Sequence, residues 1–259
     1  MSPQDMIRDA RLALACLDLT SLDDNDDAAA IDALCAKAQG PAGSPAALCV
    51  WPRFVAQARA ALPASIRVAA VANFPDGALD TGRALRETQA ILDAGGDEVD
   101  LVLPWRALAA GDAAGPAALV AAVRAACVGK TLKLIIESGE LPAPELIRQA
   151  CSIGLDAGVD FLKTSTGKTG TGATPEAARL MLETIAAHAR RDAVGFKASG
   201  GVRTVADAAV YIALVRELLG EPALTPTRLR FGASSLLADI EAVLLQQGSA
   251  GKPSAPGDY

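Results

Sequence analysis

The most constraining feature of this sequence is a regular alternation between short apolar runs and longer, alanine-rich amphipathic runs. Strands are expected at residues 12–19, 46–51, 66–72, 98–103, 131–137, 159–164, 193–197 and 228–232. Helices are expected to begin near residues 27, 52, 79, 113, 144, 175, 205 and 234. Nearly continuous apolar strands are typical of a parallel sheet that is covered on both faces. Eight strand–helix units in 259 residues therefore predict an α/β fold, a single-domain (β/α)8 TIM barrel.

The chain shows one domain and a short tail. No linker divides its middle, so residues 1–247 are expected to form a barrel catalytic domain. Residues 248–259 contain Gly, Ser and Pro without apolar periodicity, which predicts a flexible C-terminal tail. In this fold, active sites lie at the carboxyl ends of the strands, so these ends are where functional residues are expected.

Composition excludes several classes of protein. The 24 basic and 30 acidic side chains give a net charge of -6, which argues against a nucleic-acid partner. Five scattered cysteines favour reduced thiols, and neither a secretory signal nor a membrane-length apolar run is visible. We therefore expect a cytoplasmic protein without a membrane partner. The single histidine, His188, cannot by itself supply a histidine-based metal site.

Three of the seven lysines, Lys133, Lys163 and Lys197, fall inside expected strands, although lysine normally lies on helix surfaces. Lys163 and Lys197 end the sixth and seventh strands, which are neighbours in a barrel. Burial and a second ammonium group both lower the pKa of a lysine, which gives a neutral amine that can form an imine with a carbonyl. The alternative is a purely structural pairing of each lysine with a carboxylate such as Asp100 or Glu137.

Two aspartates are candidate partners for these lysines. Asp100 lies in mid-strand among apolar neighbours, where a carboxylate is costly without a cation and could also transfer a proton. Asp18 follows the first apolar run and is a second candidate of this kind, with a turn or helix-capping role as the alternative.

The last two strands are followed by loops with small residues. Gly200 and Gly201 follow the seventh strand, and Ser234 and Ser235 follow the eighth. Barrels often bind phosphate between these loops, because backbone N–H groups and a helix N-terminus favour an anion. The two loops together predict a phosphorylated small-molecule substrate.

The sequence resembles the 2-deoxy-D-ribose-5-phosphate aldolases, which are class I aldolases on a (β/α)8 barrel. The resemblance runs from Asp18 to Tyr259 and is carried by the segments 49–54, 73–75, 98–104, 136–141, 161–167, 195–203 and 231–235. It implies reversible cleavage of 2-deoxy-D-ribose 5-phosphate to acetaldehyde and D-glyceraldehyde 3-phosphate, without a metal or organic cofactor. In the cell, this reaction suits deoxynucleoside catabolism.

The resemblance also implies roles for individual residues. Lys163 would form the Schiff base, Lys197 would lower its pKa, and Asp100 would transfer protons with water. Tyr259 would assist proton transfer, or else be a frayed end. Cys49 would line the site, or else be a core cysteine. The implied substrate- and phosphate-binding residues are Thr166, Gly167, Lys168, Gly200, Gly201, Ser234 and Ser235.

Two other functions remain open from the sequence. One is a barrel isomerase or lyase that uses lysine only as an electrostatic clamp. The other is a sensor of phosphorylated metabolites that has kept the pocket but has no activity. Small-molecule partners are expected in each case, and a homodimer stays open because the sequence does not fix the oligomeric state.

Overall fold

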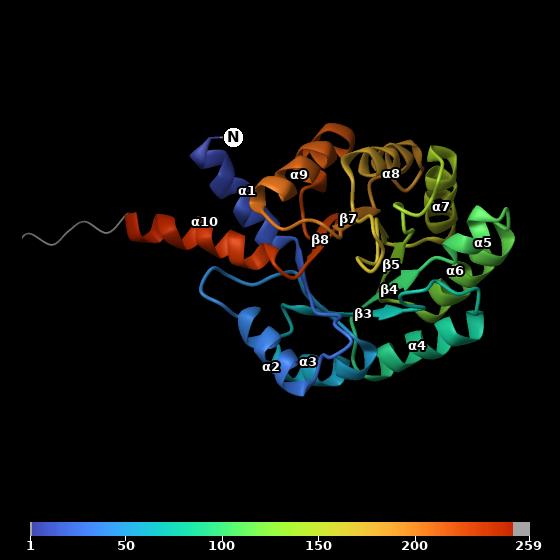
Figure 1. Cartoon of the computed structure of the whole chain (residues 1–259), viewed down its shortest axis with the longest axis horizontal. Coiled ribbons are helices and arrows are strands. Elements are labelled where there is room, and N and C mark those ends of the chain that lie inside the picture. The colour runs from blue at the N-terminus through green and yellow to red at the C-terminus, as the bar shows by residue number, and fades with distance from the viewer. Residues whose placement is uncertain (1, 251–259) are drawn as a thin grey trace, which may run out of the picture.

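The computed structural model describes residues 2–250 and confirms the predicted barrel. The strands pair in parallel and in chain order, and β8 closes onto β1 (Figure 1). They are β1 (Leu17–Thr20), β2 (Ala47–Val50), β3 (Arg67–Ala72), β4 (Glu98–Val102), β5 (Thr131–Ile135), β6 (Phe161–Lys163), β7 (Gly195–Ser199) and β8 (Leu229–Ala233).

Helices surround the barrel. They are α1 (Pro3–Ala15), α2 (Ala28–Lys37), α3 (Val55–Ala61), α4 (Thr81–Asp93), α5 (Trp105–Ala109), α6 (Ala114–Ala126), α7 (Pro144–Ala157), α8 (Pro175–Ala187), α9 (Val205–Leu219) and α10 (Leu236–Ala250), with short 3-10 turns at Pro52–Phe54 and Glu221–Ala223. Side-chain caps begin several of them: Asp27, Thr174 and Thr204 each accept a hydrogen bond from a first-turn backbone N–H. The predicted starts agree with these helices to within about two residues.

The N-terminus differs from the expected strand at residues 12–19. Ser2 forms a capping box with Asp5, and α1 continues through Ala15, so the strand begins only at Leu17. The helix buries an apolar face against α9 and α10, whereas the expectation treated the same leucines and alanines as a strand. The helical period of 3.6 residues thus determines the structure of this segment, because a short apolar run by itself fits a helix or a strand.

The C-terminal helix α10 extends to Ala250, past the boundary expected at residue 247. The rest of the expected tail, including Tyr259, lies outside the described residues. No helix in the described part of the chain has both the length and the apolar character needed to cross a membrane.

The interior of the barrel is polar in its middle layer. Strand register pairs Lys163 with Lys197 across β6 and β7, and Asp100 with Lys133 across β4 and β5. All four side chains are almost completely buried. The register therefore brings together the strand lysines and aspartates that the sequence singled out.

Candidate active site

The centre of the site is an oxygen atom shared by two lysines. Asp100 Oδ2 accepts hydrogen bonds from Lys163 Nζ at 2.8 Å and from Lys197 Nζ at 2.7 Å. Lys197 also pairs with Asp18 Oδ2 at 2.5 Å. Asp18 lies within β1 and is wholly buried, so it is a partner of the lysines and not a turn residue.

Two further basic residues contact this group of side chains, and a third carboxylate pairs with both of them. Lys133 Nζ contacts Asp18 at 2.9 Å, Glu98 at 2.5 Å and Asp100 at 3.0 Å. Arg230 reaches Asp18 at 2.5 Å and forms two hydrogen bonds with Glu98. We call the seven residues the ion cluster: Asp18, Glu98, Asp100, Lys133, Lys163, Lys197 and Arg230.

The ion cluster contains four basic groups and three carboxylates. One neutral lysine would balance its charge, which matters because an unpaired buried charge is very costly. Among the described residues, Lys163 contacts one carboxylate, whereas Lys197 contacts two and Lys133 three. Of the three lysines, Lys163 therefore loses the least electrostatic attraction to carboxylates when it is deprotonated.

The pKa shifts agree with this assignment. Burial lowers the pKa of Lys163, Lys197 lowers it further, and Asp100 opposes the change only in part. Burial alone would also lower the pKa of Lys197, but Asp100 and Asp18 outweigh it and raise that pKa. Burial would raise the pKa of Asp100, but Lys133, Lys163 and Lys197 hold it well below its ordinary value. The arrangement favours a neutral Lys163 beside a charged Lys197.

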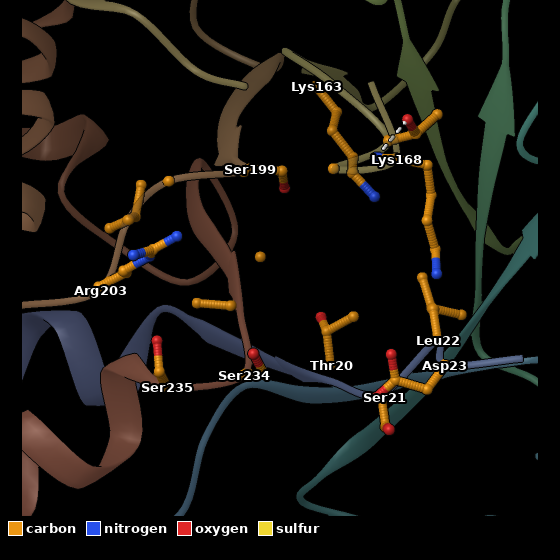
Figure 2. A pocket seen from close by; sticks show the side chains of 17 residues that line it. Thr20, Ser21, Leu22, Asp23, Lys163, Lys168, Ser199, Arg203, Ser234 and Ser235 are labelled. Carbon is orange, nitrogen blue, oxygen red and sulfur yellow. Dashed lines mark hydrogen bonds between the residues drawn. The ribbon is translucent and has the colours of Figure 1, made fainter. Parts of the chain in front are cut away.

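A cavity of about 290 Å³ lies above the ion cluster at the carboxyl ends of the strands. Figure 2 shows the amine of Lys163 pointing into it, with Ser234 and Ser235 on the opposite side. Its lining includes the following residues proposed from the sequence: Lys163, Thr166, Gly167, Lys168, Gly200, Gly201, Ser234 and Ser235. The cavity thus brings the amine and the expected phosphate loops into one site.

The end of the cavity that the sequence predicts to bind phosphate is built from two loops at helix starts. Ser234 and Ser235 immediately precede α10, and Gly200 and Gly201 lie shortly before α9. Gly200 has a φ of 81°, and a Cβ there would meet the Cα of Gly172 at 2.9 Å, so this close approach requires glycine. Backbone N–H groups can therefore face the cavity without side chains in the way.

Arg203 also lines the cavity, although it is not among the site residues predicted from the sequence. Its signal was present, since it directly follows the two glycines and Val202 in the loop expected to bind phosphate. Glu98 and Arg230 were not proposed as site residues either. Each alternates with apolar residues along its strand, which was the one available signal that they face the interior.

Cys49 and Glu137 lie near the site without lining the cavity. The Sγ atom of Cys49 is 4.0 Å from Asp100 Oδ2, and burial raises the pKa of its thiol. Glu137 has a φ of 53° and accepts hydrogen bonds from the Thr166 N–H and the Thr169 hydroxyl, which fixes the loop after Lys163. Within residues 2–250, no cluster of metal-ligating side chains is present.

Together, a closed parallel barrel and a buried lysine that faces a cavity at the strand ends form the arrangement of a barrel enzyme with a candidate lysine nucleophile. The chain belongs to the DeoC/LacD family of aldolases, whose sequence model matches residues 12–242. It is therefore a lyase that acts on small-molecule substrates.

Solved structures agree with this family. A protein described as a putative deoxyribose-phosphate aldolase from Coccidioides immitis is 27% identical, with a TM-score of 0.79 over 90% of this chain and 86% of that one. One described in the same words from Toxoplasma gondii ME49 shares the fold at 24% identity, with a TM-score of 0.88 over 97% of this chain and 99% of that one. A tetrameric deoxyribose phosphate aldolase from Aeropyrum pernix shares the fold at 21% identity, with a TM-score of 0.71 over 93% of this chain and 98% of that one.

Proposed function

We propose that the protein catalyses the reversible cleavage of 2-deoxy-D-ribose 5-phosphate to acetaldehyde and D-glyceraldehyde 3-phosphate through a Schiff base on Lys163. The observation that carries this proposal is the position of Lys163, which faces the cavity and is the least paired lysine of the ion cluster. The expected setting is deoxynucleoside catabolism in the cytoplasm.

The reaction begins at the aldehyde carbon of the sugar phosphate. The neutral Lys163 amine adds to this carbon to give a carbinolamine, which takes up one proton from solvent and loses its hydroxyl group as water, so that a protonated imine remains. Lys197 stays protonated at pH 7 because Asp100 and Asp18 raise its pKa. Burial lowers the pKa of Lys163 and the charge of Lys197 lowers it further, which favours the neutral, nucleophilic form. Asp18 acts through its ion pair with Lys197 and is a positioning residue.

The bond between C2 and C3 of the sugar then breaks. Its electron pair moves towards the imine nitrogen to give an enamine, and C3 becomes the aldehyde carbon of glyceraldehyde 3-phosphate. The proton of the C3 hydroxyl passes through water to Asp100. Asp100 relays this proton rather than storing it, because its lysine partners hold its pKa well below the ordinary value. Protonation of the enamine carbon and hydrolysis then release acetaldehyde and free Lys163.

The other end of the cavity suits the phosphate group. Lys168 and Arg203 supply positive charge, and the two loops before α9 and α10 supply N–H and hydroxyl donors. We assign this role to the residues expected from the sequence and add Arg203 to them.

Borohydride trapping tests the proposal. Incubation with acetaldehyde and borohydride should add one ethyl group, detected by intact mass and mapped to Lys163 by peptide mass spectrometry. Lys163→Met should abolish the adduct, whereas Lys168→Met, which removes another cavity lysine, should retain it. An isomerase with a lysine clamp, or a sensor without activity, would show no adduct in the wild-type protein and would refute the mechanism.

We also propose that Tyr259 assists protonation of the enamine carbon. Deletion of Tyr259 should slow deuterium exchange at the acetaldehyde methyl group and leave borohydride trapping intact. Equal exchange rates with and without Tyr259 would contradict this role.

A further inference from the structure

Ser199, the last residue of β7, has a hydroxyl group without a hydrogen-bond partner among the described residues. The residue is only 4% exposed, and it lines the cavity. Figure 2 shows its Oγ directed into the cavity, in the region between Lys163 and Arg203. An unpaired buried hydroxyl costs roughly 1–3 kcal/mol, and because this one lines the cavity, a ligand could supply the missing hydrogen bond.

The backbone of Ser199 is held firmly in place. Its N–H donates to Thr164 Oγ1 at 3.0 Å, and its carbonyl oxygen accepts hydrogen bonds from Thr164, from Ser165 Oγ at 2.8 Å and from the Ala173 N–H at 3.0 Å. These bonds fix the strand end from which the side chain projects. The hydroxyl is therefore the one polar group of Ser199 left for a substrate.

The neighbouring strand β8 leaves room for this hydroxyl. Gly232 on β8 is the register partner of Ser199, and a Cβ at position 232 would lie within 2.2 Å of Ser199 Oγ and 3.0 Å of Lys197 Cε. Any other residue at 232 would therefore displace either the hydroxyl or the lysine. Glycine at this position keeps both groups at the cavity.

Other hydroxyl groups of the cavity are occupied or differently placed. Thr20 Oγ1 donates to the Asp18 carbonyl, Ser21 Oγ donates to Asp26, and Thr166 Oγ1 accepts from the Lys168 N–H. Ser234 and Ser235 are exposed and lie at the phosphate end of the cavity. Ser199 differs from all of them, because its hydroxyl is buried and has no hydrogen-bond partner among the described residues.

We propose that Ser199 Oγ binds the hydroxyl group next to the aldehyde carbon of the acceptor, which is the 2-hydroxyl of D-glyceraldehyde 3-phosphate. The inference rests on the proposed function, in which Lys163 holds one end of the substrate and the loops before α9 and α10 hold the phosphate. Ser199 faces the middle of that span. The substrate hydroxyl at C3 exchanges a proton during cleavage and needs a titratable partner, whereas the neighbouring hydroxyl does not react and suits a serine.

Two acceptors that differ by this one hydroxyl test the proposal. Condensation of acetaldehyde is measured with D-glyceraldehyde 3-phosphate and with 3-oxopropyl phosphate, which lacks the 2-hydroxyl. Ser199→Ala should lower kcat/KM about tenfold for the first acceptor and leave it within about twofold for the second, the size expected for one neutral hydrogen bond. The resistance of the protein to urea should stay equal or rise, because an unpaired polar group has been removed.

Ser138→Ala is the matched control. Ser138 is also 4% exposed and has an unpartnered hydroxyl, but it does not line the cavity, so its removal should leave the ratio of the two acceptors unchanged. Equal losses for both acceptors in Ser199→Ala, or no loss for either, would overturn the proposal while imine trapping still supported the aldolase. A wild-type protein that traps no imine would overturn both.

Discussion

Lys163 and Lys197 face each other across β6 and β7 and donate to the same oxygen atom, Asp100 Oδ2, yet the environment moves their pKa values in opposite directions. Lys197 has a second carboxylate partner in Asp18, whereas Asp100 is the one carboxylate that Lys163 contacts among the described residues. The difference of one ion pair separates a charged lysine from one that can lose its proton.

Replacement of Lys197 should shift the pH dependence of imine formation. In Lys197→Met, the neighbouring cation is lost, so the pKa of Lys163 should rise and less of its amine should be neutral at pH 7. We expect the acidic limb of the trapping rate to move to higher pH and the rate at pH 7 to fall at least about tenfold, since one pKa unit changes the neutral fraction tenfold. Lys130→Met, away from the cavity, is the control, and a slower rate with an unmoved limb would contradict the prediction.

The pair Arg230 and Glu98 should contribute to stability as a unit. Arg230→Met leaves Glu98 with one cation fewer, and Glu98→Gln leaves Arg230 with one carboxylate fewer, so each should lower the free energy of unfolding by roughly 3–5 kcal/mol. The double variant should lose clearly less than the sum of the two changes. Urea unfolding of the four proteins measures the coupling, and strictly additive losses would show that the two residues act separately.

Acid should destabilise the protein through Asp18 and Asp100. Burial would raise both pKa values in the folded state, but buried lysines lower both, and Arg230 lowers that of Asp18 further. The stability that these groups contribute is therefore fully present above the pKa of an unfolded aspartate, about 3.9, and is lost as pH falls below it. As far as these two groups determine it, the urea concentration at the midpoint of unfolding should therefore stay constant from pH 7 to about pH 4 and then decline. A urea midpoint that rose as the pH fell below 4 would contradict this prediction.

Arg203 and Lys168 should affect phosphorylated substrates selectively. Arg203→Ala and Lys168→Ala should each raise KM for 2-deoxyribose 5-phosphate by roughly 10-fold or more, the size of a charge-assisted hydrogen bond. The rate with unphosphorylated 2-deoxyribose should change little. Arg179→Ala is the control, because this exposed arginine pairs with Glu217 outside the cavity. Equal losses on both sugars would show that these residues hold the loops and not the phosphate.

The sequence predicted the barrel because the strand runs are largely apolar and several helices have a start signal such as Asp27 or Thr174. It also predicted that Lys163, Lys197 and Asp100 would meet, since parallel neighbouring strands end at one edge. It did not predict α1, because residues 12–15 are equally compatible with a strand until the capping box at Ser2 is weighed.

The finer features of the site depend on pairings that a linear sequence does not specify. That Arg230 contacts both Asp18 and Glu98 follows from barrel closure between β8 and β1. The Ser199 hydroxyl has no partner among the described residues, whereas the side-chain hydroxyls of Thr164 and Ser165 bind the backbone N–H and carbonyl oxygen of Ser199. Neither feature has a signal in the spacing of the residues.

The depth of the ion cluster has a consequence for attempts to engineer this barrel. Lys133 and Arg230 do not line the cavity, yet they contribute to the charge around Lys163, the proposed nucleophile. Replacing such interior ion pairs with well-packed apolar side chains often strengthens a protein. In this barrel, an apolar side chain in place of Lys133 or Arg230 alone would leave three basic groups against three carboxylates, so Lys163 should stay protonated and unreactive.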